Sequence, residues 1–359
     1  MITVEKQPFL DAIKSVKTAT AKANLQPVLS AIHLKTENGG LTLTCTDCTN
    51  IARAVVEANI TENFDVCINA EKLDAIVSRL DNTITLEIKD AFCIIKSGKI
   101  VFKCLYIQGN EFPNINIDLD GQKILLSKNE FISGVNKTCF ATLENNQNNI
   151  ISGICFTFGE KSYEIVATDG NRLSQVVFND TAFQGDGQYV IPKVALTSVA
   201  KIIKNNDLQI FCKNDNVVFY TDNFVYSTRL LNGKYPEYKQ IIPKEYKQQI
   251  VIDKSELLKS LETISIMAND RTNIIKLIFK ENNLDLTSQS ENGEAKDNIE
   301  IDYPSNNDEL MIAFNYHFLI EGLKAMNSDV ITININNNTS AVLFVGDYNY
   351  LAMPIQIKE

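Results

Sequence analysis

One pattern of apolar and polar positions occurs three times along the chain. An alternating apolar segment passes through a lysine and a polar position into a stretch whose apolar residues recur at helical spacing. The three lysines are Lys6, Lys128 and Lys254, so the copies start roughly 120 to 130 residues apart, which is the length of one ordinary domain. The chain is therefore expected to contain three tandem copies of one domain.

The apolar periodicity predicts two β-helix-β-β-β halves in each copy, which gives an α+β fold with two helices per domain packed on antiparallel sheets. The predicted domains are residues 1–122, 123–247 and 248–359, and an aromatic-proline pair marks each linker, at Phe112-Pro113 and Tyr235-Pro236. Polar residues at the helix starts are expected to act as N-caps; they are Gln7, Asn129 and Ser255.

Three details of the third domain are also predicted. Strands are expected over Ile299–Tyr303 and Tyr350–Ile357, because apolar residues concentrate there. The acidic residues Glu291 and Glu294 are expected to lie in a polar loop.

A row of similar domains has a structural consequence. Neighbouring domains can join sheet edge to sheet edge in a curved row, which leaves one unpaired strand at each end. The opposite end of a second chain would cover such an edge, and head-to-tail contacts close into a ring when the rotation allows. The pattern thus predicts a ring-shaped self-assembly.

Composition narrows the class of protein. The formal net charge of −10 argues against a protein that wraps nucleic acid with its whole surface, but it permits a local basic lining. No long apolar run or signal-like N-terminus is present, so a cytoplasmic location is expected. The eight cysteines are expected to be reduced, and the C-x-x-C at Cys45 and Cys48 lacks a second ligand pair, so neither a metal nor another cofactor is predicted.

Basic residues gather on the polar faces of several predicted helices. On one of these helices they recur at helical spacing opposite an apolar face. A duplex enclosed by a ring needs only weak phosphate contacts of this kind, although an ordinary solvated helix face would show the same pattern. The candidate DNA-facing residues are Lys14, Lys17, Lys72, Arg79, Lys137, Lys193, Lys201 and Lys204.

Catalytic signals are weak. The two histidines, His33 and His317, fit structural or surface roles, and no phosphate-binding loop, dinucleotide fingerprint or nucleophile elbow is present. Two alternatives remain open on the residues alone. One is a hydrolase that uses Asp169 with a second carboxylate as acid and base; the other is an interaction scaffold that never meets DNA.

Three motifs carry a family resemblance: A-T-D-G-N-R-L at 167–173, L-N-G-K-Y-P-E-Y at 231–238 and Y-L-A-M-P-I at 350–355. With the threefold repeat, they resemble the bacterial sliding clamp, the beta subunit of the replicative DNA polymerase, over the whole chain. The resemblance implies a head-to-tail homodimeric ring that encircles double-stranded DNA and has no catalytic activity. It also implies partners: the polymerase catalytic subunit, other replication and repair proteins, and an ATP-dependent loader that opens the ring.

The resemblance also implies two sets of site residues. A peptide-binding pocket between the second and third domains would use Ile151, Thr168, Gly170, Asn171, Arg172, Leu173, Pro236, Ile241, Leu351, Met353, Pro354 and Ile355. The dimer contact would use Lys72, Ile76, Leu80, Phe102 and Cys104 of the first domain with Ile266 and Met267 of the third. Asn171, Gln356 and Cys104 depart from the family pattern, so the resemblance leaves peptide preference and interface strength open.

Overall fold

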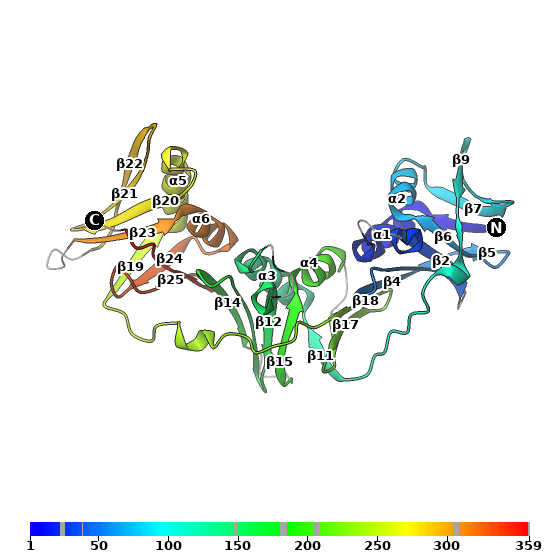
Figure 1. The fold of residues 1–359 in the computed structure, drawn as a ribbon, viewed down its shortest axis with the longest axis horizontal. Helices are drawn as coiled ribbons and strands as arrows, with labels where there is room; N and C mark the ends of the chain where they lie inside the picture. Colours follow the sequence, from blue (N-terminus) through cyan, green and yellow to red (C-terminus); the bar gives the residue numbers. More distant parts are fainter. Residues whose placement is uncertain are drawn as a thin grey trace. The chain divides into compact units, whose positions relative to one another are not determined.

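The computed structural model describes residues 1–21, 26–37, 39–144, 146, 149–179, 185–203, 208–303 and 309–357. Within these ranges each of the three domains has a strand, a helix and three strands, followed by the same order again (Figure 1). The predicted α+β plan of two such halves per domain is confirmed. Two short strands, β5 (Asn59–Ile60) and β10 (Ile107–Gln108), are additions in the first domain.

The elements fall into three equivalent sets. The first domain contains β1 (Ile2–Glu5), α1 (Lys6–Val16), β2 (Ala31–Glu37), β3 (Gly40–Thr46), β4 (Asn50–Glu57), β6 (Asp65–Asn69), α2 (Ala70–Ser78), β7 (Thr83–Lys89), β8 (Phe92–Ser97) and β9 (Ile100–Leu105). The second contains β11 (Gln122–Leu126), α3 (Lys128–Thr138), β12 (Gly153–Phe158), β13 (Ser162–Thr168), β14 (Arg172–Asn179), β15 (Gly187–Pro192), α4 (Lys193–Ile202), β16 (Leu208–Cys212), β17 (Asn216–Thr221) and β18 (Phe224–Arg229). The third contains β19 (Gln248–Asp253), α5 (Lys254–Ile264), β20 (Ile274–Lys280), β21 (Asn283–Ser290), β22 (Gly293–Glu300), β23 (Leu310–Asn315), α6 (Tyr316–Ala325), β24 (Val330–Ile335), β25 (Val342–Val345) and β26 (Asn349–Ala352).

The strands form four sheets, two of which cross a domain boundary. The first junction sheet has the order β10-β6-β2-β3-β4-β18-β17-β16-β11, and the second has the order β15-β12-β13-β14-β26-β25-β24-β19. The other two lie within one domain: the N-terminal sheet, β5-β1-β7-β8-β9, and the C-terminal sheet, β22-β21-β20-β23. All the neighbouring strands pair antiparallel.

The chain divides into two compact units. The first unit is Met1–Phe131 with Val194–Leu230, and the second is Ile132–Lys193 with Leu231–Glu359. Each junction sheet lies within one unit, so β4 pairs with β18 in the first unit and β14 pairs with β26 in the second. A compact unit of this chain is therefore not the same as one sequence repeat.

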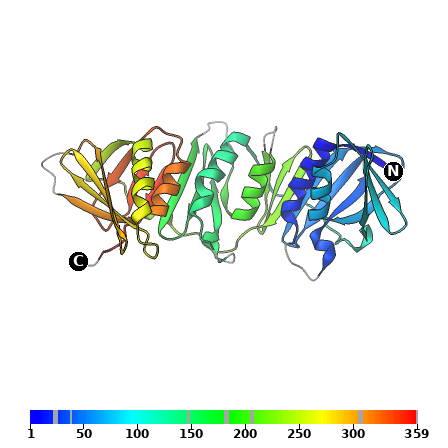
Figure 2. The ribbon, with the colours of Figure 1, turned by 90° about the horizontal axis from the view of Figure 1, so that it is seen from above.

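Helices pack in pairs within each unit. In the first unit α1 lies beside α2, and in the second α5 lies beside α6 (Figure 2). The apolar stripe of α1, formed by Phe9, Ile13 and Val16, is fully buried, and the equivalent stripe of α5 joins the core of the third domain. None of the helices in the described ranges is long and apolar enough to span a membrane.

The predicted N-cap positions are wrong by two residues. The helices α1, α3 and α5 all begin at the repeated lysine, and Glu5 and Asp253 are the N-caps of α1 and α5. The Lys6 N–H donates to the Asn82 carbonyl at 2.7 Å, so a tertiary contact satisfies the first helical donor. Gln7, Asn129 and Ser255 therefore lie inside the first turn of their helices.

The repeated lysine has a structural function in the third domain. The Lys254 Nζ donates to the Met326 carbonyl, just beyond α6, at 2.8 Å. A cation at this place interacts favourably with the carbonyl groups at a helix C-terminus. This contact ties the first helix of the domain to the second.

The two strand predictions in the third domain also need correction. Glu291 lies in the turn between β21 and β22, as predicted, but Glu294 lies in β22. β22 runs from Gly293 to Glu300 instead of from Ile299 to Tyr303. An edge strand needs few apolar residues, and Ile299 is the one fully buried side chain of β22. β26 ends at Ala352, well before Ile357, because the following Met353-Pro354 brings in a residue without a backbone N–H.

A helical glycine in the second unit provides a test of this packing. A Cβ added at Gly322 in α6 would lie 2.3 Å from a ring carbon of Tyr350. The buried ring cannot easily move, because its hydroxyl donates to the Phe318 carbonyl at 2.8 Å. Although alanine has the higher helix propensity by about 1 kcal/mol, we expect Gly322→Ala to lower the free energy of unfolding by about 1 to 3 kcal/mol.

Urea denaturation of the full-length protein measures this effect. Lys324→Ala, an exposed change in the same helix, is the control and should alter the free energy of unfolding by less than about 1 kcal/mol. An equal or greater stability for Gly322→Ala would show that the α6–β26 packing is looser than described.

Candidate functional site

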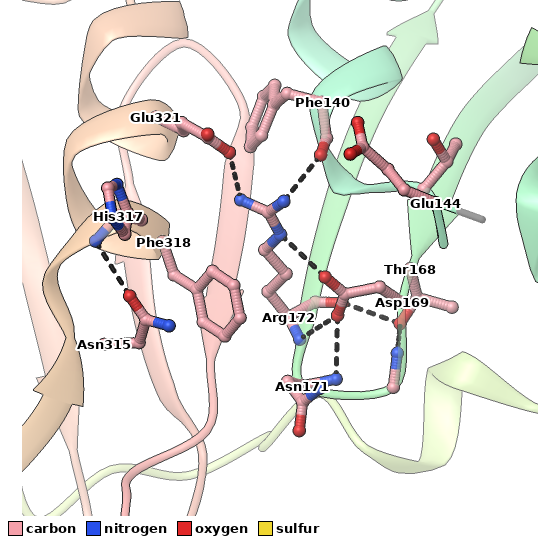
Figure 3. A network of polar contacts seen from close by, with 12 residues as sticks. Phe140, Glu144, Thr168, Asp169, Asn171, Arg172, Asn315, His317, Phe318 and Glu321 are labelled. Atoms are coloured by element: carbon pink, nitrogen blue, oxygen red, sulfur yellow. Dashed lines mark hydrogen bonds and ion pairs between the residues drawn. The ribbon is translucent and has the colours of Figure 1, made fainter. Parts of the chain in front are cut away.

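The turn between β13 and β14 is held by its own side chains. The Asp169 carboxylate accepts hydrogen bonds from the N–H groups of Asn171 and Arg172, at 2.9 and 3.1 Å (Figure 3). The Thr168 hydroxyl donates to the Arg172 carbonyl at 2.6 Å and accepts from the Gly170 N–H at 3.1 Å. Gly170 has a φ of +93°, which glycine adopts without strain. The T-D-G-N-R sequence thus encodes one rigid turn.

The same turn occurs in the first unit, between β3 and β4. Asp47 accepts from the N–H groups of Thr49 and Asn50, and Thr46 donates to the Asn50 carbonyl at 2.8 Å. Cys48 takes the place of Gly170, with a φ of +74°. Because the aspartate has the same turn-forming role in both domains, Asp169 is a structural residue, and the hydrolase alternative loses its candidate acid–base group.

Arg172 distinguishes the second turn from the first. Its Nε donates to Asp169 at 2.9 Å, its Nη2 donates to the Phe140 carbonyl at 2.7 Å, and its Nη1 pairs with Glu321 on α6 (Figure 3). The guanidinium carbon lies 4.5 Å from the ring centre of Phe318 and 5.5 Å from that of Phe140. Arg172 therefore joins β14 to α6 and is buried itself.

The electrostatics of Arg172 agree with this role. Burial alone would lower the pKa of the guanidinium, but the hydrogen bond to Glu321 and the nearby charges of Asp169 and Glu321 raise it above its ordinary value. Arg172 stays charged, and its donors in this network are directed at protein acceptors. Like Thr168, Leu173 and Leu351, it is a predicted peptide-binding residue that is itself buried.

Several of the other predicted peptide-binding residues lie in one apolar cluster of the second unit. Leu173 and Leu351 are buried there as directly opposed residues of β14 and β26, while Ile151 and Met353 pack against the cluster from partly exposed positions. The Met353 N–H donates to the Asn171 carbonyl at 2.8 Å. The C-terminal segment is thereby fixed beside the turn.

The surface above this cluster is open and partly apolar. Gly170, Asn171, Pro236 and Ile241 are exposed, and Met353, Pro354 and Ile355 are half-buried. We call these seven residues, all predicted to bind peptide, the peptide surface. Tyr235 and Tyr238, from the segment that carries Pro236, are buried in the same cluster as Leu173 and Leu351. Thr168 is buried beneath the turn.

The predicted DNA-facing residues differ in availability. Lys14, Lys72, Arg79 and Lys201 are exposed. Lys17 pairs with Glu71 and Asp74 of α2, and Lys193 pairs with Glu144 at 3.4 Å. Lys204 lies outside the described residues.

Lys137 needs a correction, because it is buried and its Nζ lies 2.7 Å from Asp347. Burial alone would raise the pKa of the Asp347 carboxyl, but the bond from Lys137 and a backbone N–H lower it below its ordinary value. Lys137 is a core ion-pair partner rather than a DNA-facing cation. From the sequence it looked exposed because helical spacing does not show which neighbouring domain covers a polar face.

The predicted dimer residues also divide. Ile266, in the short helix Ser265–Met267, is 79% exposed, and Ile76, Phe102, Cys104 and Met267 are half-buried. The assignment of Leu80 to the dimer contact needs a correction, because its side chain is 1% exposed and lies buried in its own domain. The sequence reasoning missed three exposed apolar residues of β9, Ile100, Val101 and Leu105. Their signal was available, since β9 is apolar on both faces.

Comparison with known proteins matches the three domains of the chain to the three domains of one family. Family models for the N-terminal, central and C-terminal domains of the DNA polymerase III beta subunit match residues 1–116, 125–237 and 239–356. A beta sliding clamp from Synechococcus elongatus is 30% identical over 97% of this chain and 96% of its own length. One from Chlamydia pneumoniae is 24% identical, with 99% of both chains covered.

Solved structures show the same fold. The DNA polymerase III beta subunit of Thermotoga maritima superimposes with a TM-score of 0.93 at 23% identity over the full length of both chains. The sliding clamp of Pseudomonas aeruginosa bound to griselimycin gives a TM-score of 0.92 at 21% identity, covering 99% of both chains.

The internal contacts of Arg172 predict an order of stabilities. Arg172→Met leaves the nearly buried Asp169 carboxylate without its cation and should lower the free energy of unfolding by about 3 to 5 kcal/mol. Glu321→Gln should lower it by less than about 1 kcal/mol, because the Glu321 side chain is 46% exposed. Chemical denaturation of both variants checks the order, and similar losses for the two would contradict it.

Proposed function

The chain belongs to the DNA polymerase III beta subunit family, the beta sliding clamps, and we propose how its four sheets perform that function. A member of this family is a non-catalytic processivity subunit of the replicative polymerase. Two copies of the chain join head to tail into a ring, the ring encircles double-stranded DNA, and it slides without reading sequence. Polymerase and other replication and repair proteins are tethered to it through short peptides.

The proposal rests on one observation, the rule by which strands of neighbouring domains pair. In both junction sheets the fourth strand of one domain pairs with the last strand of the next, as β4 with β18 and β14 with β26. In element order, β22 and β9 are the equivalents of these strands. Within the described chain, β22 and β9 each lie at the edge of their own sheet, without a partner from a neighbouring domain. A second copy supplies the missing partner for each.

The chemistry of the two edges suits this pairing. β9 exposes Val101 and Leu105, which are 53% and 71% accessible, and an exposed apolar edge strand is an aggregation hazard unless something covers it. β22 exposes Glu294, Asp297 and Glu300. Beside it, Ile266 is an exposed apolar anchor. Pairing β9 with β22 would give a nine-stranded sheet, the size of the first junction sheet.

Enclosure explains how an acidic protein holds DNA. With a net charge of −10, the chain is not suited to tight binding by charge alone. The exposed Lys14, Lys72, Arg79 and Lys201 would give weak phosphate contacts, which position a duplex without reading bases. A ring therefore retains DNA by topology, and an ATP-dependent loader is needed to open it.

The peptide surface is proposed as the tethering site. A buried apolar floor with an adaptable methionine at its rim suits short peptides that carry apolar anchors. The functional domains are proposed as residues 1–122, 123–247 and 248–359, and the site of action is the bacterial cytoplasm.

Retention on circular and on linearised duplex DNA tests the proposal that the ring holds DNA by enclosing it. The protein is loaded onto nicked circular duplex with its loader, separated from free protein at high salt, and then treated with a restriction enzyme that cuts once. We expect wild-type protein to stay on the circle and to leave after linearisation, because high salt screens direct phosphate contacts but does not open a ring.

Two variants with the same kind of change serve as controls. Ile266→Lys places a charge at the proposed contact and should give monomers by light scattering and no retention on the circle. Val251→Lys alters an apolar residue that is 60% exposed on β19 and should behave as wild type. Retention that survives linearisation, or retention by monomeric Ile266→Lys, would contradict enclosure.

A further inference from the structure

The segment that connects β18 to β19 is tied to the second junction sheet by one ion pair. The Lys239 Nζ lies 2.6 Å from an oxygen of Glu164 on β13. The two side chains differ in environment, since Glu164 is 10% exposed and Lys239 is 67% exposed. Lys239 lies between Pro236 and Ile241, the two exposed residues that this segment contributes to the peptide surface.

Glu164 is a buried carboxylate that stays ionised. Burial alone would raise its pKa, but the interactions with Lys239, Tyr238 and Gln175 outweigh burial and hold the pKa below its ordinary value. The Gln175 amide donates to Glu164 at 2.8 Å. The second oxygen of the carboxylate is therefore also satisfied inside the protein.

The network continues across the sheet to the last strand. The Asn349 amide donates to the Gln175 side-chain oxygen at 3.1 Å, and these residues are directly opposed on β14 and β26. β26 leads within a few residues to Met353 and Pro354. A continuous chain of polar contacts thus links the segment on one side of the peptide surface to the strand that supplies the other side.

We propose that Glu164 and Lys239 are positioning residues for partner-peptide binding, an inference that rests on the proposed function of the peptide surface. Their ion pair holds the segment of Pro236 and Ile241 at a fixed distance from Leu173 and Met353. A wall fixed in advance does not have to be ordered when the peptide binds, so less of the binding free energy is lost. Neither residue needs to touch the peptide.

The same segment provides a matched control. Lys234 and Glu237 form an ion pair of similar length, 2.7 Å, but their side chains are 80% and 61% exposed. A surface pair of this kind contributes almost nothing to structure. Removing either pair deletes one cation–carboxylate contact from one segment, so the comparison isolates the effect of the buried partner.

The test measures binding of the purified polymerase catalytic subunit of the same organism to immobilised full-length protein. We expect Glu164→Gln to weaken binding about tenfold, which is about 1.4 kcal/mol, mainly through faster dissociation. Lys234→Met should bind as wild type. Lys239→Arg should retain most of the affinity, because arginine keeps the cation, and Glu164→Gln with Lys239→Met should bind no more weakly than the more affected single variant.

A second readout separates positioning from general stability. Glutamine keeps the shape of Glu164 and a hydrogen-bond partner for Gln175, so the thermal midpoint of Glu164→Gln should stay close to that of wild type. Unchanged affinity in Glu164→Gln, or a loss of affinity matched by Lys234→Met, would overturn the inference.

The double variant Met353→Ala with Pro354→Ala distinguishes failure of the positioning role from failure of the proposed function. It should lose binding and remain dimeric. If it binds as wild type, or if wild type does not bind, the peptide surface is not the tethering site and the positioning role falls with it. If it loses binding while Glu164→Gln does not, the proposed function stands and the positioning role alone is wrong.

Discussion

Backbone hydrogen bonding between strands of neighbouring domains is the interaction on which the architecture depends. Peptide N–H and C=O groups need partners, and a strand at a sheet edge leaves a row of them unpaired. This chain satisfies two such rows by joining β4 to β18 and β14 to β26. β9 and β22 remain unpaired edges within the described chain. Pairing of β9 with β22 of a second copy would satisfy the backbone groups of both edges.

The second junction also brings together residues proposed for peptide recognition. Pairing of β14 with β26 places Leu173 opposite Leu351 and brings the C-terminal segment beside the Thr168–Arg172 turn. Buried polar groups then fix the surroundings: Arg172 ties the turn to α6, and Glu164 ties the connecting segment to the sheet. The first junction has the same turn but has Asn50 at the position of Arg172, bonded to Thr228 across the strands. The difference between the junctions is therefore in side chains rather than in backbone.

The fold could be predicted from the sequence because its signals are local and repeated three times. Apolar periodicity located the helices and most strands within a few residues. It failed for β22, since an edge strand with Ile299 as its one fully buried residue has no alternating pattern to detect. It also failed for the N-cap of α1, because the partner of the Lys6 N–H is the carbonyl of Asn82, far along the chain.

The site was predictable in part. The motif residues Leu173, Leu351 and Met353 do share one cluster, but sequence reasoning did not find Phe140, Phe318 or Glu321, whose contacts with Arg172 are tertiary. Lys137 and Leu80 were assigned to surfaces although they are buried. In each case the missing information was which neighbouring element covers a given face.

Amide hydrogen exchange of β9 and β22 tests the pairing rule most directly. If the two edges pair between copies, the amides of both strands exchange slowly at high protein concentration. Both should become fast together, on dilution and in Ile266→Lys, while β4 and β14 remain protected. Exchange of β9 and β22 that is equally fast in wild type and Ile266→Lys, at every concentration, would contradict the account.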